Sequence, residues 1–387
     1  MDTLERFAEA KLTALAERQL RRSLHETAPC GPVEVKRNGR ALISFCGNDY
    51  LNLSQHPAVK RAAVEATERW GAGAGASRLV TGNHPLFAAL EHRLARLKGT
   101  DDACVFGSGY LANLGIIPSL VGAGDLIVAD ELSHACLRAG AALSRSRVEI
   151  FRHNDLDHVE ALLAEHRSDH ERALVLTDGV FSMDGDLAPV AALAEIAAAR
   201  DAWLMTDDAH GIGVVGGGRG SSFVGGAKTE VPLQMGTLSK AVGCYGGYLC
   251  AAQPVIDLIR TRARPFIYST GLPPGVVAAS TAALDLIAND PDLVALPLRK
   301  ASRFCARLNL PAPESCIVPI LLGAPEHALA ASRLLEDEGF LVAAIRPPTV
   351  PEGTARLRLT FSAGHDEDDI ERLADIVRER ILDRDQP

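Results

Sequence analysis

The sequence has 387 residues, of which 47% are hydrophobic and 23% are charged, and its formal net charge is −9. This length exceeds what one hydrophobic core usually organises, so two lobes are expected. The basic residues are scattered along an acidic chain, which disfavours a nucleic-acid-binding protein.

The remaining composition points away from membranes, secretion and metals. No apolar run reaches the length of a membrane-spanning helix, and residues 1–6 include acidic side chains and no apolar signal segment. The eight cysteines are dispersed without a C-x-x-C pair, and Cys104 and Cys250 lie within apolar runs. This pattern favours reduced, mostly buried thiols over disulfides or a zinc site. We therefore expect a cytoplasmic enzyme that binds no metal, nucleic acid or membrane.

Residues 1–60 are predicted to form an N-terminal segment. Apolar and charged positions alternate at helical spacing over residues 4–24, and the basic residues after Gln19 suit a helix C-terminus. Residues 41–45 are predicted to form a strand that leads into a turn. The alternating glycines of residues 71–76, just beyond this segment, follow no obvious strand, so a dinucleotide site is the weaker interpretation of them.

Residues 61–288 are predicted to form the large lobe. Short apolar strands alternate with helical patterns from about residue 100 to 252, which is typical of βαβ units and of an α/β fold with a mainly parallel sheet. The expected helices include residues 156–166 and 190–199, and residues 216–220 favour a mobile loop over a phosphate-binding one. The seven predicted strands are residues 103–106, 125–129, 147–151, 173–178, 202–207, 233–237 and 247–252.

Residues 289–387 are predicted to form a smaller α+β lobe that closes over the substrate. The boundary is placed near residues 288–291, where Asn, Asp and Pro interrupt the helical pattern. The predicted helices are residues 294–308, 328–338 and 367–382, and the predicted strands are residues 317–322, 340–345 and 355–361.

Three features of the large lobe together indicate a pyridoxal phosphate (PLP) site. PLP requires a lysine amine for a Schiff base, a carboxylate for its pyridine nitrogen and a polar cradle for its phosphate. Lys240 follows the strand at 233–237, and Asp207 ends the strand at 202–207, where open α/β sheets bind ligands. Ser108-Gly109-Tyr110 precedes a predicted helix whose free N–H groups suit a phosphate. Alone, these features are commonly a surface lysine, a helix cap and a turn, but their order at strand ends favours the cofactor site.

Longer motifs spread over nearly the whole chain resemble those of the α-oxoamine synthases. These are PLP-dependent acyltransferases of the aspartate aminotransferase fold type, which condense an amino acid with an acyl thioester and lose CO2. The resemblance implies PLP as cofactor and a homodimer with sites formed between subunits. The motifs that carry it are Asn48–Leu51, Leu132–Ala135, Gly179–Asp186, Asp207–Gly211, Tyr268–Thr270 and residues 345–359.

The resemblance also implies roles for individual residues. Lys240 would bind PLP and then act as a base on the substrate Cα, and Asp207 would hold the pyridinium. His210 would hydrogen-bond the phenolic oxygen, and His134 would stack on the ring and contact the substrate. Further cofactor contacts are expected from Gly109, Tyr110, Ser182, Thr237 and, across the dimer, Thr270.

For the substrate, the resemblance implies L-alanine and a pimeloyl thioester. Arg358 and Arg346 are candidates for the alanine carboxylate, because a guanidinium offers two parallel hydrogen bonds. Asn48 is a further substrate-binding candidate, and Arg21 and Thr349 match positions expected to touch the acyl substrate or close the site. Alternation along the strand predicts that Arg356 and Arg358 share one face.

Several alternatives stay open. A sister α-oxoamine synthase, such as glycine C-acetyltransferase, would share the catalytic residues, although the run Arg346–Pro351 argues for the pimeloyl thioester. A non-catalytic binding or regulatory protein of the same fold is the alternative from another class. The acyl carrier is left as CoA or acyl carrier protein, because basic residues at 145, 147 and 152 could receive either one or neither. Asn52 and Thr206 depart from the family pattern without removing a reactive group.

Overall fold

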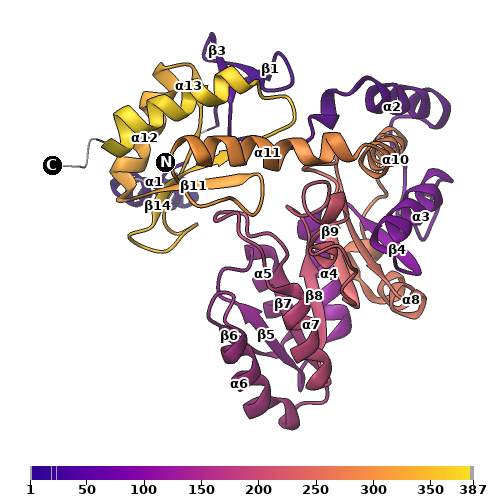
Figure 1. Cartoon of the computed structure of the whole chain (residues 1–387). Coiled ribbons are helices and arrows are strands. Elements are labelled where there is room, and N and C mark those ends of the chain that lie inside the picture. The colour runs from indigo at the N-terminus through magenta and orange to yellow at the C-terminus, as the bar shows by residue number, and fades with distance from the viewer. Residues whose placement is uncertain (1, 19, 23, 384–387) are drawn as a thin grey trace.

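A seven-stranded sheet forms the centre of the large lobe in the computed structural model, which describes residues 2–18, 20–22 and 24–383 (Figure 1). The strand order is β4-β10-β9-β8-β7-β5-β6; β10 runs antiparallel to both of its neighbours, and the pairs from β9 to β6 are parallel. The predicted mainly parallel sheet is thereby confirmed. The strands are β4 (Asp102–Phe106), β5 (Leu126–Asp130), β6 (Arg147–Phe151), β7 (Ala173–Asp178), β8 (Trp203–Asp207), β9 (Leu233–Thr237) and β10 (Gly247–Ala251).

Helices cover both faces of this sheet, which is why its strands read as continuous apolar runs. Alternate residues, such as Phe106 and Val105 of β4, enter two different cores. One face is covered by α4 (Gly109–Leu120), α5 (Ala135–Ser144) and α8 (Gln253–Arg262), and the other by α3 (Leu86–Lys98), α6 (Leu156–His166), α7 (Val190–Ala199) and α10 (Pro274–Asn289).

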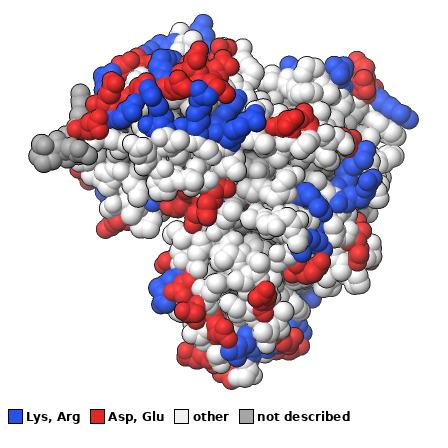
Figure 2. Space-filling view, in the orientation of Figure 1, with Lys and Arg blue, Asp and Glu red and all other residues white. Residues whose placement is uncertain are grey.

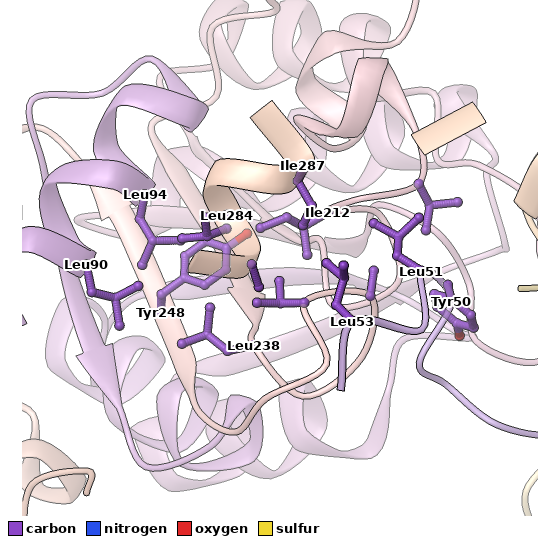
Figure 3. Packing of buried hydrophobic residues seen from close by; sticks show 14 of the residues in the cluster. Tyr50, Leu51, Leu53, Leu90, Leu94, Ile212, Leu238, Tyr248, Leu284 and Ile287 are labelled. Carbon is purple, nitrogen blue, oxygen red and sulfur yellow. The ribbon is translucent and has the colours of Figure 1, made fainter. Parts of the chain in front are cut away.

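The N-terminal segment is shared between the two lobes. Its strands β1 (Thr27–Pro29), β2 (Glu34–Arg37) and β3 (Arg40–Ser44) form a four-stranded sheet with β12 (Phe340–Leu341) of the smaller lobe. Tyr50 and Leu53 instead pack with Ile212, Leu238 and Tyr248 of the large lobe (Figure 3). Residues 45–50 therefore cross from one core to the other, and the divisions at residues 60 and 288 stay predictions.

The smaller lobe packs helices on a three-stranded antiparallel sheet. Arg303 pairs with Glu367 and Glu371, and Arg307 pairs with Asp375, so ion pairs bridge two of these helices. Figure 2 shows the resulting mixture of basic and acidic side chains on this face. The elements are β11 (Ile317–Gly323), β13 (Ala343–Ile345), β14 (Ala355–Thr360), α11 (Pro291–Arg307), α12 (Pro325–Asp337) and α13 (Glu367–Val377).

Two predicted elements were wrong in extent. The first helix, α1, spans only Thr3–Glu17, and none of its residues is buried, so tertiary packing does little to extend it; Gln19, at the expected basic end, lies outside the described residues. The strand predicted at 340–345 is two strands, because β12 pairs with β3 and β13 pairs with β14. The last helix has the predicted extent to Leu382, but it changes from an α-helix to a π-helical turn after Val377.

Local geometry explains one departure from the family pattern. Asn52 has a φ of 54°, in the left-handed region that glycine and asparagine adopt most readily. Its Nδ2 donates to the carbonyl of Pro32 over 2.7 Å, which ties the turn to the N-terminal sheet. Asparagine is thus a conservative replacement for glycine here. Among the described residues, no helix has the length and apolarity needed to traverse a bilayer.

Candidate active site

Lys240 lies just beyond the C-terminal end of β9, in a tight turn. The turn is closed by hydrogen bonds from Gly243 N to Lys240 O (2.7 Å) and from Leu238 N to Gly246 O (2.9 Å), while Leu238 and Ala241 are anchored in the core. Burial lowers the pKa of Lys240, although the carboxylates of Asp207 and Asp178 oppose this shift. Burial is the larger effect, so the amine is easier to deprotonate than a free lysine.

Asp207 is fixed as a buried acceptor at the end of β8. Its Oδ2 accepts from Asn113 Nδ2 over 2.7 Å, and its Oδ1 accepts from Ala209 N over 2.9 Å. Asp178 of β7 lies in register beside it. Burial and the charge of Asp207 raise the pKa of Asp178 well above its usual range, which favours the neutral form of Asp178.

Asp178 and Asn113 were not among the predicted site residues. Asp178 ends a predicted strand as Asp207 does, so the strand-end rule already offered a signal for it. Asn113 gave no signal, because one amide inside a helix carries no pattern. Lys98 was missed for the same reason: its Nζ lies 2.6 Å from Asp208 Oδ2, both side chains are fully buried, and the ion pair holds the segment that follows Asp207.

His134 begins α5 close to Lys240 and Asp207. Its Nδ1 accepts from the backbone N–H of Cys136 over 3.3 Å and lies 2.8 Å from the Cys136 sulfur. Burial and the charge of Lys240 lower the pKa of His134. The ring is therefore neutral at pH 7 with its proton on Nε2, because Nδ1 serves as an acceptor.

His210, Tyr50 and Arg358 form a buried polar cluster. The Tyr50 hydroxyl lies 2.7 Å from His210 Nδ1 and 3.2 Å from Asn48 Oδ1, and it accepts from Arg358 Nη2 over 3.4 Å. Burial, followed by the positive charges of Lys240 and Arg358, lowers the pKa of His210 well below its usual range. His210 is thus a neutral hydrogen-bonding residue beside Lys240.

The two arginines of β14 share a face, as the alternation predicted, and both contact the loop after β7. Arg358 Nε donates to the carbonyl of Ser182, and Arg358 Nη1 lies 3.5 Å from Asn48 Oδ1. Arg356 pairs with Asp184 and is buried, so it is not a surface charge. Only Arg358 also reaches the Tyr50 and His210 cluster.

The turn predicted to hold the cofactor phosphate lies at the start of α4. The N–H groups of Gly109 and Tyr110 belong to the first helical turn, where no intrahelical carbonyl is in reach. A Cβ at Gly109 would lie 3.3 Å from Thr237 Cβ, and one at Gly247 would lie 2.5 Å from Ser108 O. Gly247 is thus needed for β10 to approach the turn, and Gly109 fits closely against Thr237 of β9. Thr237 Oγ1 also lies 2.8 Å from Ser239 Oγ, which adds a hydroxyl that was not predicted.

Four predicted residues are not brought into this cluster. Arg21 is exposed between α1 and β1, and Thr270 is exposed beside residues 76–77. Arg346 and Thr349 form a turn after β13, in which Thr349 N donates to Arg346 O over 3.0 Å. Because β13 pairs with β14, this turn lies one strand away from Arg358. The roles expected of these four residues stay predictions.

The assembled residues fit PLP. The amine of Lys240 lies near the buried carboxylate of Asp207, which Asn113 and Ala209 hold in place. His134 and His210, both neutral, lie beside them. The turn at Gly109 offers backbone N–H groups that no side chain of that residue blocks. These are the covalent anchor, the ring partner and the phosphate cradle that PLP requires.

Comparisons with known proteins agree with this chemistry. Residues 40–377 match the model of the aminotransferase class I and II family. The chain is 64% identical to 8-amino-7-oxononanoate synthase from Methylocella silvestris, over 90% of this chain and 99% of the relative. It is 60% identical to the enzyme of that name from Beijerinckia indica subsp. indica, over 97% and 98% of the two chains.

Solved structures share the fold. A serine palmitoyltransferase variant from S. paucimobilis with bound PLP–myriocin superposes with a TM-score of 0.90 at 29% identity, over 97% of each chain. An 8-amino-7-oxononanoate synthase from Francisella tularensis superposes with a TM-score of 0.76 at 26% identity, over 89% of this chain and 98% of that one.

Proposed function

Because this chain belongs to the aminotransferase class I and II family and, within it, to the 8-amino-7-oxononanoate synthases, we propose that the cluster around Lys240 condenses L-alanine with a pimeloyl thioester. The enzyme is a PLP-dependent acyltransferase that forms 8-amino-7-oxononanoate with release of CO2, a step of biotin biosynthesis. The observation that carries the assignment of the site is that Lys240 and Asp207 lie at the ends of adjacent strands, close enough for their charges to interact.

Each side chain of the site has its own proposed role in the reaction. When bound, PLP withdraws electrons from the alanine Cα, which eases loss of its proton and later of CO2. Lys240 would hold the cofactor and then move the Cα proton, and its lowered pKa makes its amine a better base at neutral pH than a free lysine. Asp207 would supply the negative charge for the ring nitrogen, and neutral His210 and His134 would orient the ring without adding charge.

Arg358 is the residue proposed to bind the alanine carboxylate. It is buried, and its Nη1 and Nη2 atoms make only long contacts of 3.5 and 3.4 Å, so a substrate carboxylate can replace them. We expect Arg358→Lys to raise the KM for L-alanine by about 10- to 100-fold, because one ammonium cannot reproduce the paired N–H donors of a guanidinium. Steady-state kinetics at saturating acyl donor measure this change.

The exposed Arg333 of α12 offers the matched control for this prediction. Arg333→Lys should leave the KM for L-alanine unchanged. An Arg358→Lys enzyme with an ordinary KM for L-alanine would remove Arg358 from carboxylate binding and leave Arg346 as the remaining candidate.

A homodimer is part of the proposed function. Leu4 and Phe7 of α1 are 71% and 60% exposed, which is unusual for large apolar side chains on one helix. The exposed Thr270 is proposed to reach the cofactor phosphate of the neighbouring subunit. Sedimentation equilibrium should give twice the chain mass, and a monomer that retains full activity would contradict the shared site.

A cytoplasmic location is likewise proposed. Its support is the set of eight free cysteines in the described part of the chain, five of them buried, which suits a reducing compartment. Detection of the native protein in the soluble fraction of lysed cells, and its absence from the medium, would test this location.

A competition assay tests the substrate assignment. The PLP-loaded protein receives equal L-alanine, glycine and L-serine with acetyl-, succinyl-, pimeloyl- and palmitoyl-CoA, and mass spectrometry identifies the products; pimeloyl-acyl carrier protein is offered in parallel. We expect the alanine–pimeloyl product to dominate, and the ratio of the two pimeloyl donors identifies the acyl carrier. A dominant glycine–acetyl product would instead assign the sister activity of glycine C-acetyltransferase.

A further inference from the structure

We propose that His153 is a positioning residue that fixes the loop at residues 179–187, and through it Arg358, for recognition of the amino-acid carboxylate. The proposal rests on the function proposed above for Arg358. His153 follows β6 and lies outside the cluster around Lys240, so the reaction as described does not use it.

The geometry around His153 requires a charged ring. Its Nδ1 lies 3.1 Å from Asp130 Oδ1, and its Nε2 lies 2.7 Å from Asp186 Oδ2. A carboxylate only accepts hydrogen bonds, so both ring nitrogens must donate, and only the imidazolium carries a proton on each. His153 is therefore a cationic bridge between the end of β5 and the loop that follows β7.

The surroundings of the ring favour this charge. Burial opposes it, but the hydrogen bonds and negative charges of Asp130 and Asp186 outweigh burial and raise the pKa of His153 to about 10. Glu131 adds a third carboxylate, which accepts from His153 N over 2.9 Å. The edge of one ring meets the face of the other where His153 packs on Phe181, with ring centroids 4.4 Å apart.

The loop held by His153 is the joint between the two lobes. On the side of the smaller lobe, Arg358 Nε donates to Ser182 O, Arg356 pairs with Asp184, and Ser315 Oγ donates to Gly185 O over 2.6 Å. On the side of the large lobe, the bond from His153 to Asp186 holds the same loop. A substitution at His153 therefore shifts this loop, and with it the Ser182 carbonyl that orients the Arg358 guanidinium.

Two variants test the bridge in the holoenzyme. His153→Gln removes the charge and one donor, and Asp186→Asn removes the acceptor charge on the loop. For each we expect a KM for L-alanine raised about tenfold, with kcat changed less than about threefold, because binding geometry is lost while the reacting groups stay in place. The absorption spectrum of bound PLP should not change. His327→Gln, on the exposed surface of α12, is the matched control and should behave as wild type.

The charge on the ring is tested separately in the wild-type protein. Imidazole 15N NMR should show His153 protonated on both nitrogens at pH 8, and protonated on one nitrogen in Asp186→Asn at that pH. Since the pKa is raised by folding, the stabilisation is complete below about pH 6.5 and is lost as the pH rises through about 10. The melting temperature of the wild type should therefore fall more steeply above pH 9 than that of His153→Gln.

Two results would overturn the proposal. An unchanged KM for L-alanine in both variants, with only a lower melting temperature, would make the bridge purely structural. A neutral His153 in the wild type at pH 8 would remove it outright. If His153→Gln does not fold, Asp186→Asn and the NMR measurement decide alone. A wild-type enzyme that condenses a different amino acid would refute the proposed substrate, yet the same KM effect would then appear for that amino acid.

Discussion

Lys240→Ala is expected to abolish turnover and the absorption band of lysine-bound PLP together, with kcat falling by at least about 10⁴-fold. The reason is that one amine performs two tasks, holding the cofactor and moving the Cα proton, and the other lysines do not replace it: Lys98, the buried one, is committed to its ion pair with Asp208. Because Lys240 lies in a turn anchored by Leu238 and Ala241, its truncation should leave the fold intact.

Two measurements accompany the assay of Lys240→Ala. Borohydride reduction followed by peptide mass spectrometry should place the mass of PLP on the peptide containing residue 240 in the wild type and on no peptide of the variant. Lys36→Ala, at an exposed position of β2, is the control and should keep both activity and cofactor. Turnover by Lys240→Ala at a wild-type rate would remove this residue from its proposed role.

Asp207→Asn is expected to lower kcat by about 10³-fold, equivalent to roughly 4 kcal/mol of transition-state stabilisation. The substitution keeps the shape of the side chain but removes the charge opposite the cofactor ring nitrogen, so the ring no longer withdraws electrons as strongly. The hydrogen bonds survive, because Asn113 Oδ1 is buried without a partner among the described residues and accepts from the new amide once the Asn113 side chain rotates.

Rapid-quench kinetics and circular dichroism distinguish a chemical defect from a folding defect in Asp207→Asn. The spectrum should match that of the wild type, and the melting temperature should shift by only a few degrees. Asp178→Asn is the comparison variant. Because the raised pKa of Asp178 already favours its neutral form, we expect this variant to retain most activity. The assignment of charge within the pair would be reversed if Asp178→Asn were the inactive variant.

Much of the large lobe follows from local sequence. The strands from β4 to β10 are short apolar runs between turn residues, and burial on both sides of a parallel sheet requires such runs. The carboxyl ends of parallel strands lie at one edge of a sheet, so the sequence alone predicts that Asp207, Lys240 and the turn at Gly109 meet there. Membership of the family was also predicted from the motifs that surround these residues.

Contacts between segments far apart in the sequence could not be predicted from local sequence patterns. The predicted strand at 340–345 is divided between two sheets because β3, about three hundred residues earlier, takes Phe340 and Leu341 as partners, with Phe340 paired to Ile43. The helix predicted at 4–24 ends at Glu17, and none of its residues is buried, so tertiary packing does little to extend it. In both cases the outcome depends on what lies opposite in space, which local patterns do not encode.

The sequence by itself determined the chemistry of this protein: which residue types are present, at which strand ends they fall, and hence the cofactor and the reaction class. Only the tertiary structure decided the pKa shifts of these residues. The pKa of Asp178 is raised, that of His210 is lowered and that of His153 is raised, because burial and neighbouring charges act over a few ångströms between segments far apart in the chain.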